Sequence, residues 1–297
     1  MDFTIKNVIL ENIEKSEIKV KYVATEKNME LEICSFASSS SGNCFLVRSE
    51  TTEIIVDAGI TAKKIDDNMK KLGSATEKLS GIMVTHEHVD HIKSLHTVMR
   101  KNPAVKVYAS KGTIDAMVSK NDKIPVERTV PVKNGGSFMV GDIKVTPFDI
   151  LHDTAEPVAF AFEKSGRKAA VLTDTGCVNS EIFDNIKDCD VLVLEANHEP
   201  NLLLYCRYPY EVKRRILGDR GHLSNEAAGE CIIKMLKELG GSKVPKVVLA
   251  HLSSENNTPQ QAFVTIRNML ENENYYIGKD IELEVAAKDA ASQILRV

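Results

Sequence analysis

The stretch Val84-Thr-His-Glu-His-Val-Asp-His91 decides how this chain is interpreted. It places three histidines and an aspartate within six residues, after an apolar strand pattern and before a helical pattern. Alternate residues of an extended segment point to the same side, so His86 and His88 face one point. Beyond the bend, Asp90 and His91 can face a neighbouring point. Because clustered, desolvated polar groups without a partner are costly, the segment predicts the halves of two metal sites.

Length and composition are those of an ordinary globular protein. The chain has 297 residues, of which 43% are hydrophobic and 27% charged, enough to bury the core of one large or two small domains. No apolar run approaches the roughly 20 residues of a membrane span, and the first residues lack the features of a secretory signal. We therefore expect a cytoplasmic protein without a membrane segment. Because the net charge is −4, binding to nucleic acid would require a local basic patch.

The six cysteines are scattered along the chain and include no Cys-x-x-Cys pair. This spacing argues against a thiolate zinc site and against a disulfide framework. We therefore expect free thiols that are mostly buried.

Short β-branched runs alternate with helical patterns from residue 31 onward. Strands are expected at Leu31–Phe36, Cys44–Arg48, Glu53–Asp57, Gly81–Thr85, Val105–Ala109, Ser137–Val140, Ile143–Phe148, Val158–Glu163, Lys168–Thr173, Val191–Glu195, Lys246–Ala250 and Ile281–Ala286. Helices are expected at Ala62–Leu72, Asp90–Lys101, Lys111–Ser119, Ser180–Asp188, Tyr210–Leu217, Ser224–Leu239 and Pro259–Asn272. Turns at Gly141 and Gly166 predict two hairpins. The pattern predicts an α+β fold with two packed sheets flanked by helices.

Residues 1–30 follow this pattern less well. We interpret them as an N-terminal extension in which Glu17–Val23 is a candidate for an added strand. Residues 31–297 are then the main domain.

The segment around His86 resembles the His-x-His-x-Asp-His signature of the metallo-β-lactamase superfamily, and further family positions follow in order at strand ends. The resemblance covers residues 31 to about 290. It implies an αββα sandwich of two mixed sheets flanked by helices. The matching positions are Asp57 in Ile-Ile-Val-Asp-Ala-Gly59, His152 in Ile-Leu-His-Asp153, Asp174 in Val-Leu-Thr-Asp-Thr-Gly176 and His251 in Val-Leu-Ala-His-Leu-Ser253.

The resemblance also implies a set of ligands for two divalent metal ions, Zn or Mn, with Fe as a further candidate. One ion takes His86, His88 and His152, the second takes Asp90, His91 and His251, and Asp174 lies between both. Asp57 would support this site from behind the ligands. Two such ions would activate a shared hydroxide for hydrolysis. His88 stands where similar di-iron oxygen reductases carry glutamate, which favours hydrolysis over redox chemistry.

Two further segments, Val191–Glu195 and Asp219–Asn225, favour a phosphodiester substrate. In phosphodiesterases of this superfamily that resemble the tRNA 3′-processing enzyme, a strand-end glutamate pairs with a histidine beside the scissile phosphate. Glu195 and His222 match those positions, so His222 would protonate the leaving oxygen. With Asp90 they are the residues expected to act in catalysis. The alternative is an unrelated surface glutamate and a histidine that caps a helix.

A basic strip between these segments, Lys213 to Arg215 with Arg220, concentrates positive charge in an otherwise acidic chain and has tyrosines interleaved. Such a strip suits phosphate contacts and stacking on bases or sugars. For the basic strip, the alternative is a helix face that only contacts solvent. For the Ser-Gly-Asn loop it is a plain turn, and for His198 it is a loop histidine that does not contact substrate. The residues predicted to contact substrate are Ser40, Asn43, His198, Tyr208, Lys213, Arg214, Arg215 and Arg220.

Four segments narrow the resemblance to the YycJ (WalJ) group of bacterial exonucleases with this fold. They are Ala37–Asn43, Glu195–His198, Tyr208–Tyr210 and Arg215–Glu226. The resemblance implies 5′-to-3′ degradation of double-stranded DNA, manganese as a common metal and a link to DNA repair. DNA is thus favoured over RNA as the partner. A small cyclic nucleotide, an RNA 3′ end, and a thioester or lactone remain alternative substrates.

The distance between two of the predicted ligands limits how substrate can be held. Only 77 positions separate Asp174 from His251, too few for the large inserted domain of many members that process RNA or DNA. The enzyme would therefore hold its strand with local loops or with the partner of a homodimer.

Overall fold

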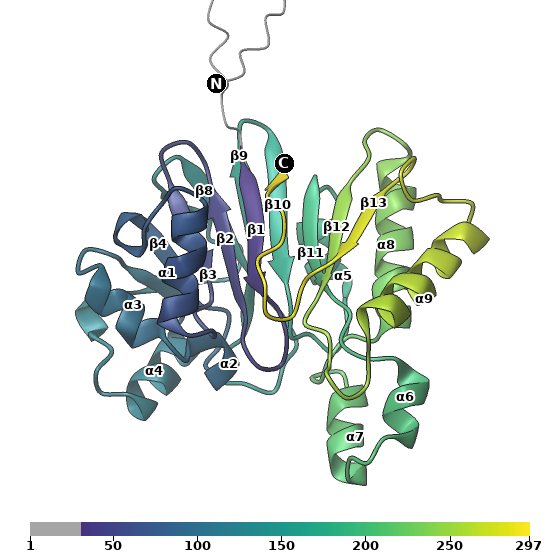
Figure 1. Ribbon diagram of the computed structural model, residues 1–297, viewed down its shortest axis with the longest axis horizontal. Helices are drawn as coiled ribbons and strands as arrows, with labels where there is room; N and C mark the ends of the chain where they lie inside the picture. The colour runs from purple at the N-terminus through teal and green to yellow at the C-terminus, as the bar shows by residue number, and fades with distance from the viewer. Residues whose placement is uncertain (1–30) are drawn as a thin grey trace, which may run out of the picture.

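The computed structural model describes residues 31–297. These residues form two seven-stranded sheets that pack face to face, with helices on the two outer faces (Figure 1). The predicted αββα sandwich of two mixed sheets is confirmed. The candidate strand Glu17–Val23 lies outside the described residues.

The first sheet has the order β14-β1-β2-β3-β4-β5-β6. Neighbours from β14 to β3 are antiparallel, and neighbours from β3 to β6 are parallel. Its strands are β1 (Glu32–Ala37), β2 (Cys44–Arg48), β3 (Glu53–Val56), β4 (Gly81–Met83), β5 (Val107–Ser110), β6 (Thr129–Val132) and β14 (Leu295–Arg296).

The second sheet has the order β13-β12-β11-β10-β9-β8-β7. Here β7 to β10 are antiparallel, and β10 to β13 are parallel. Its strands are β7 (Phe138–Val140), β8 (Ile143–Asp149), β9 (Val158–Lys164), β10 (Arg167–Leu172), β11 (Val191–Glu195), β12 (Lys246–Ala250) and β13 (Glu282–Val285).

The helices lie on both outer faces of the sandwich. Helices α1, α3 and α4 pack on the first sheet, and α5, α8 and α9 pack on the second (Figure 1). The helices are α1 (Ala62–Lys71), α2 (Val89–Ile92), α3 (Leu95–Lys101), α4 (Lys111–Lys120), α5 (Ser180–Ile186), α6 (Pro200–Tyr205), α7 (Tyr210–Leu217), α8 (Asn225–Leu239) and α9 (Pro259–Asn272), with 3-10 turns at Thr76–Lys78 and Val126–Arg128. No helix among residues 31–297 has the length and apolar character that crossing a bilayer requires.

The core follows from the alternation of side chains along the strands. In β9, Phe160 and Phe162 enter the core between the two sheets, whereas Ala159 and Ala161 face the helices over the second sheet. Small residues on the helix side leave room for the helices to approach. The six cysteines are unpaired, and four of them are buried, as expected.

Both predicted hairpins are confirmed. Ser165 and Gly166 form the two-residue turn between β9 and β10, with φ of 51° and 78°. Positive φ at both positions is the requirement of a type I′ turn, whose twist matches that of the strands. Gly141, with φ of 57°, begins the turn between β7 and β8.

The prediction of a single helix at Asp90–Lys101 is wrong, because the segment forms two helices, α2 and α3. Ser94, between them, leaves the helical conformation with φ of −112° and ψ of 9°. Its backbone N–H donates to the carbonyl oxygen of Ala58 at 2.9 Å, while the Ala58 N–H donates to the carbonyl of His91 at 2.7 Å. These contacts with the loop after β3 replace the helical hydrogen bonds, and periodicity in sequence does not report them.

Three short elements were missed by the sequence analysis: β6, β14 and α6. Strand β6 contains Pro131, which a sheet tolerates because β6 lies at an edge. Strand β14 has only two residues, so its formation depends on pairing with β1.

Candidate metal centre

The predicted ligands meet at one edge of the sandwich because they follow the carboxyl ends of strands. In the first sheet, Asp57 follows β3 and the His86–His91 segment follows β4. In the second sheet, His152, Asp174 and His251 follow β8, β10 and β12, which point the same way. The carboxyl ends of parallel strands share an edge, so side chains up to 194 residues apart, Asp57 and His251, converge there.

The ligands form two groups, and in each the ligand atoms lie within 4.8 Å of one another. The groups are His86, His88 and His152, and Asp90, His91 and His251. Asp174 lies between them, with Oδ2 at 3.2 Å from Nε2 of His91 and Oδ1 at 3.9 Å from Nε2 of His152. The structure thus brings all seven predicted ligands together at one edge of the sandwich.

Neighbouring oxygens orient the histidine rings. Nδ1 of four rings lies near an oxygen: His86 at 3.0 Å from Thr85 Oγ1, His91 at 2.7 Å from Asp57 Oδ2, His152 at 3.1 Å from the Gly221 carbonyl, and His251 at 2.8 Å from Glu195 Oε1. A carbonyl and a carboxylate can only accept, so the rings of His91, His152 and His251 donate from Nδ1 and keep the lone pair of Nε2 for a cation. The Thr85 hydroxyl beside His86 can either donate or accept.

Several buried atoms at the centre lack a hydrogen-bond partner among residues 31–297. They are Nε2 of His86, His152 and His251, and Oδ2 of Asp174. A buried polar atom without a partner is destabilising, and such atoms call for an explanation. Because these atoms belong to the predicted ligands, whose ligand atoms lie within 4.8 Å of one another in each group, the residues fit a pair of divalent cations.

The backbone is strained at three of the converging positions. Asp57, Asp174 and His251 have φ of 63°, 58° and 54°, in the left-handed region that residues other than glycine rarely adopt. Such conformations persist only where the surroundings enforce them, and they cluster at functional sites. Gly59 is required for a different reason, the close approach of two backbone segments. A β-carbon there would lie 1.5 Å from the carbonyl oxygen of Asp90.

Neighbouring histidines lower the pKa values of two buried carboxyl groups at the centre, Asp174 and Glu195. Burial by itself would raise the pKa of Asp174, but His251 and His91 beside it lower that pKa well below its usual range. Burial would likewise raise the pKa of Glu195, but His222 and His251 lower it to about 2. The centre therefore holds buried negative charge that suits divalent cations.

Glu195 and His222, predicted as a catalytic pair, are in contact. Nδ1 of His222 lies 2.8 Å from Oε1 of Glu195 and 3.7 Å from Oδ1 of Asp174. The same Oε1 also lies 2.8 Å from Nδ1 of the ligand His251. Oε2 accepts from the backbone N–H of Thr175 at 2.8 Å. One buried carboxylate therefore orients both a metal ligand and the histidine next to the metal centre.

Comparison with known proteins agrees with this geometry. Residues 52–252 match the model of the β-lactamase superfamily domain. The chain belongs to the metallo-β-lactamase superfamily.

Within the superfamily the chain belongs to the YycJ/WalJ group. It is 36% identical to exodeoxyribonuclease YycJ of Bacillus anthracis, over 86% of this chain and 95% of the relative. It is 33% identical to exodeoxyribonuclease WalJ of Streptococcus pneumoniae serotype 2, over 88% and 96% of the two chains. The metallo-β-lactamase-fold protein YhfI from Bacillus subtilis has the same fold, with a TM-score of 0.64, 14% identity and coverage of 89% and 99%. The chain is thus a hydrolase of the metallo-β-lactamase fold.

Two of the predicted substrate contacts are buried. Asn43 is fully buried, and its side-chain amide contacts the carbonyl of Ser39 and, at 3.2 Å, Nε2 of His91. His198 is 1% exposed, and burial lowers the pKa of its ring to about 4. Ser40, in contrast, is exposed in the loop between β1 and β2. Of these three, only Ser40 lies on a surface that substrate reaches without rearrangement.

The residues of the basic strip differ in how far their charged groups are engaged by other parts of the protein. Arg215 forms a two-pronged ion pair with Asp153, the residue after the ligand His152. The ammonium of Lys213 donates to the carbonyl of Leu204 at 2.7 Å, which ties α7 to the end of α6. Arg214 is exposed, and within residues 31–297 its one ion-pair partner is Glu211, at 3.5 Å. Arg220 is exposed and has no ion-pair partner within 4.0 Å among residues 31–297.

Tyr208 is half-buried in the connection between α6 and α7. Burial raises the pKa of its hydroxyl, and Glu255 nearby adds to the rise.

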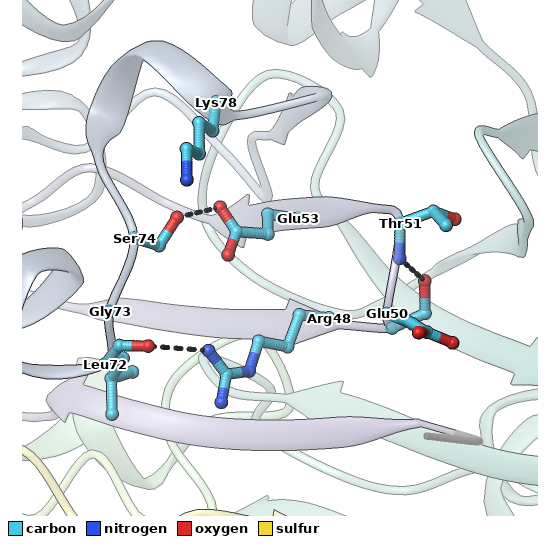
Figure 2. A pocket seen from close by; sticks show the side chains of 9 residues that line it. Arg48, Glu50, Thr51, Glu53, Leu72, Gly73, Ser74 and Lys78 are labelled. Atoms are coloured by element: carbon cyan, nitrogen blue, oxygen red, sulfur yellow. Dashed lines mark hydrogen bonds between the residues drawn. The ribbon is translucent and has the colours of Figure 1, made fainter. Parts of the chain in front are cut away.

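A hollow of about 280 Å³ lies at the opposite end of β2 and β3 from the metal centre (Figure 2). Arg48 donates to the carbonyl of Leu72 there at 3.2 Å, and the hydroxyl of Ser74 donates to Glu53. These polar groups bind one another (Figure 2). No cluster of potential metal ligands among residues 31–297 falls in this hollow.

Two residues that were not predicted, Thr85 and Asp153, support the site. Thr85 lies between Asp57 and His86, and its hydroxyl contacts both. Asp153 anchors Arg215, as described above. Each residue is adjacent in sequence to a predicted ligand, and this adjacency is the only feature of the sequence that could have indicated its role. Their partners Asp57 and Arg215 come from distant segments.

Proposed function

We propose that this chain is a metal-dependent exonuclease that degrades double-stranded DNA from 5′ ends. The contact between Glu195 and His222 beside Asp174 carries the proposal, because it provides a proton donor where a phosphodiester would lie. The names of the YycJ and WalJ relatives, both exodeoxyribonucleases, support DNA as the substrate. The direction of cleavage rests on the same resemblance. A cytoplasmic location and a role in DNA repair belong to this proposal.

The two ligand groups around Asp174 would hold two divalent cations, Zn or Mn with Fe as a further candidate. When bound, these cations supply an activated water and neutralise charge on the phosphate. Asp90 has 24% of its side chain exposed and belongs to the second group, so it faces the substrate side as well. Asp57 keeps the ring of His91 in place from behind.

His222 is placed to give a proton to the leaving oxygen. Its Nδ1–H donates to Glu195, so Nε2 is the nitrogen that remains for substrate. The side chain of His222 is 19% exposed, whereas that of Glu195 is fully buried. Substrate can therefore reach the ring of His222, and Glu195 acts only by orienting that ring and His251.

DNA would be held by exposed cations beside this edge. Arg214 and Arg220 are the members of the basic strip whose guanidinium groups are least engaged by the protein itself. Arg215 would instead position α7 through its ion pair with Asp153. The net charge of −4 means that long-range attraction is weak, so affinity would depend on this strip.

Removing Arg214 and Arg220 together is expected to weaken DNA binding and to reduce its dependence on salt. Each phosphate contact contributes about 0.9 to the slope of log K against log salt concentration, so the Arg214→Ala/Arg220→Ala variant should lose roughly 2 from that slope. Fluorescence anisotropy of a labelled duplex over a salt series measures this slope.

The matched control is Lys78→Ala/Lys106→Ala, which removes two exposed positive charges at the opposite edge of the first sheet. It should leave the slope unchanged. Equal slopes for the wild type and the Arg214/Arg220 variant would return the strip to a solvated helix face.

A nuclease assay with separately labelled ends tests the proposed function. Duplex DNA carrying a label at either the 5′ or the 3′ end is incubated with the protein and Mn²⁺, with duplex RNA and bis-p-nitrophenyl phosphate in parallel. The expected result is early release of the 5′ label as mononucleotides while the 3′ label stays on shortening strands. Hydrolysis of the small diester alone would replace DNA by a small-molecule substrate, and early loss of the 3′ label would reverse the polarity.

A further inference from the structure

A hollow of about 470 Å³ lies on the hairpin formed by α6 and α7. Figure 1 shows these two helices projecting beyond the sheets at the edge where α2 lies, which is the edge of the metal centre. The hollow is lined by Leu204, Tyr210, Lys213, Arg214, Leu217 and Gly218. It is distinct from the ligand groups, yet it lies on the same side of the molecule.

The lining of this hollow is apolar and open to solvent. Leu204 is 53% exposed, Tyr210 is 73% exposed and Leu217 is 47% exposed. Exposed apolar side chains that are scattered singly are normal, whereas these three line the same hollow. The face of the Tyr210 ring is free to stack on a planar ligand.

The charge of the hairpin selects the kind of ligand. Between residues 205 and 220 there are five basic and two acidic residues, in a chain with a net charge of −4. Like charges would disfavour docking of this hairpin against the hairpin of a second copy. The lining residues Lys213 and Arg214 instead complement a polyanion, and the apolar lining residues complement a planar ring.

The hollow is joined directly to the catalytic histidine. The backbone N–H of His222 donates to the carbonyl of Ile216 at 3.0 Å, and Ile216 precedes the lining residue Leu217. The N–H of Gly221 donates to Gly218, another lining residue, at 2.7 Å. A β-carbon on Gly221 would lie 2.2 Å from the Ile216 carbonyl oxygen, so this close approach requires glycine. These backbone hydrogen bonds therefore fix the lining residues Leu217 and Gly218 relative to His222.

We propose that this hollow receives the base of an unpaired nucleotide next to the scissile phosphodiester. Tyr210 stacks on the base, Leu204 and Leu217 enclose it, and Arg214 contacts a flanking phosphate. Bases inside a duplex are covered by their neighbours, so the nucleotide must have left the stack at a strand end. The inference rests on the proposed nuclease function and adds the part of the substrate that the hairpin binds.

The test compares two substrates and three variants. One duplex carries an unpaired 5′-terminal nucleotide with its base, and the other carries an abasic residue at that position. Wild type, Tyr210→Ala and Tyr210→Phe are assayed for kcat/KM on both, with Tyr276→Ala as a control that removes an exposed tyrosine ahead of β13. Quenching of 2-aminopurine at the terminal position on binding gives a readout independent of turnover.

Loss of the Tyr210 ring is expected to lower kcat/KM on the base-carrying substrate roughly 5- to 150-fold, the range that corresponds to stacking of one base. The wild type should lose a similar factor on the abasic substrate, and Tyr210→Ala should lose little more there. Tyr210→Phe should keep the activity because it keeps the ring, and Tyr276→Ala should resemble the wild type. The 2-aminopurine signal should be quenched by the wild type and less so by Tyr210→Ala.

An equal loss on both substrates would overturn the proposal, because Tyr210 would then act without a base. A lower sedimentation coefficient for Tyr210→Ala than for the wild type would also overturn it, by making the hollow a contact between copies. Failure of the wild type to cleave any nucleic acid while it hydrolyses bis-p-nitrophenyl phosphate would overturn the proposed function itself. Failure of the proposed function can be distinguished from failure of the base-binding proposal, because it appears with the wild type alone, before any variant is compared.

Discussion

Replacing Asp174 by asparagine is expected to abolish hydrolysis and to reduce the bound metal below two ions per chain. Asp174 faces both ligand groups, so its charge serves both positions. Asparagine keeps the shape of the side chain and tolerates the positive φ of 58° at this position, so the backbone is spared. Losing several kcal/mol of charge stabilisation corresponds to a decrease in kcat of about 10³-fold or more.

Metal content measured by plasma emission spectroscopy and turnover of the small diester check this prediction together. Asp184→Asn is the matched control, since Asp184 is exposed on α5 and pairs with Lys187. The control should keep both metal content and activity. If Asp174→Asn retained two tightly held ions and full turnover, Asp174 could not be a ligand shared by both positions.

Replacing His222 by alanine is expected to leave both metals in place and to slow DNA cleavage by about 10²- to 10⁴-fold, the usual contribution of a general acid. The loss should depend on the leaving group. A nucleoside oxygen needs a proton as it departs, whereas p-nitrophenolate is stable as an anion. The variant should therefore lose much less on bis-p-nitrophenyl phosphate than on DNA.

The comparison of the two substrates separates a catalytic role from a structural one. His96→Ala on α3 is the control, because His96 is half-buried and belongs to none of the ligand groups. Equal losses of His222→Ala on both substrates would remove the proton-donor role. A loss of metal in this variant would instead make His222 a ligand next to Asp174.

The convergence of the predicted ligands could be anticipated from the sequence because their spacing repeats a known order and each stands at the end of a strand. The signature that begins at His86 needs only local geometry, and Asp174 and His251 follow recognisable buried strands. The fold followed from the same strands, whose alternation along β9 assigns one face to each neighbouring layer. The spacing of the signature and the alternation along the strands are local in sequence, so they can be recognised without knowing the tertiary structure.

The prediction of a continuous helix after the signature failed for a physical reason. The carbonyl of His91 accepts from Ala58, and Ser94 donates to Ala58, across 33 and 36 residues of chain. Hydrogen bonds between distant segments compete with those of the helix. Amphipathic periodicity in the sequence does not indicate where such long-range hydrogen bonds form. The same limitation applies to β14, which exists only because β1 offers an edge.

The sequence by itself determined the chemistry of the centre: which imidazoles and carboxylates are present, their order, and the neighbouring glutamate and histidine. Only the tertiary structure decided how each side chain is used. It buries Asn43 against His91 and commits Arg215 to Asp153, while Arg214 stays exposed. It also gives Glu195 two histidines to orient instead of one. The reason is that residue type sets what a group can bind, whereas burial and the partners within hydrogen-bond distance are set by segments far away in the chain.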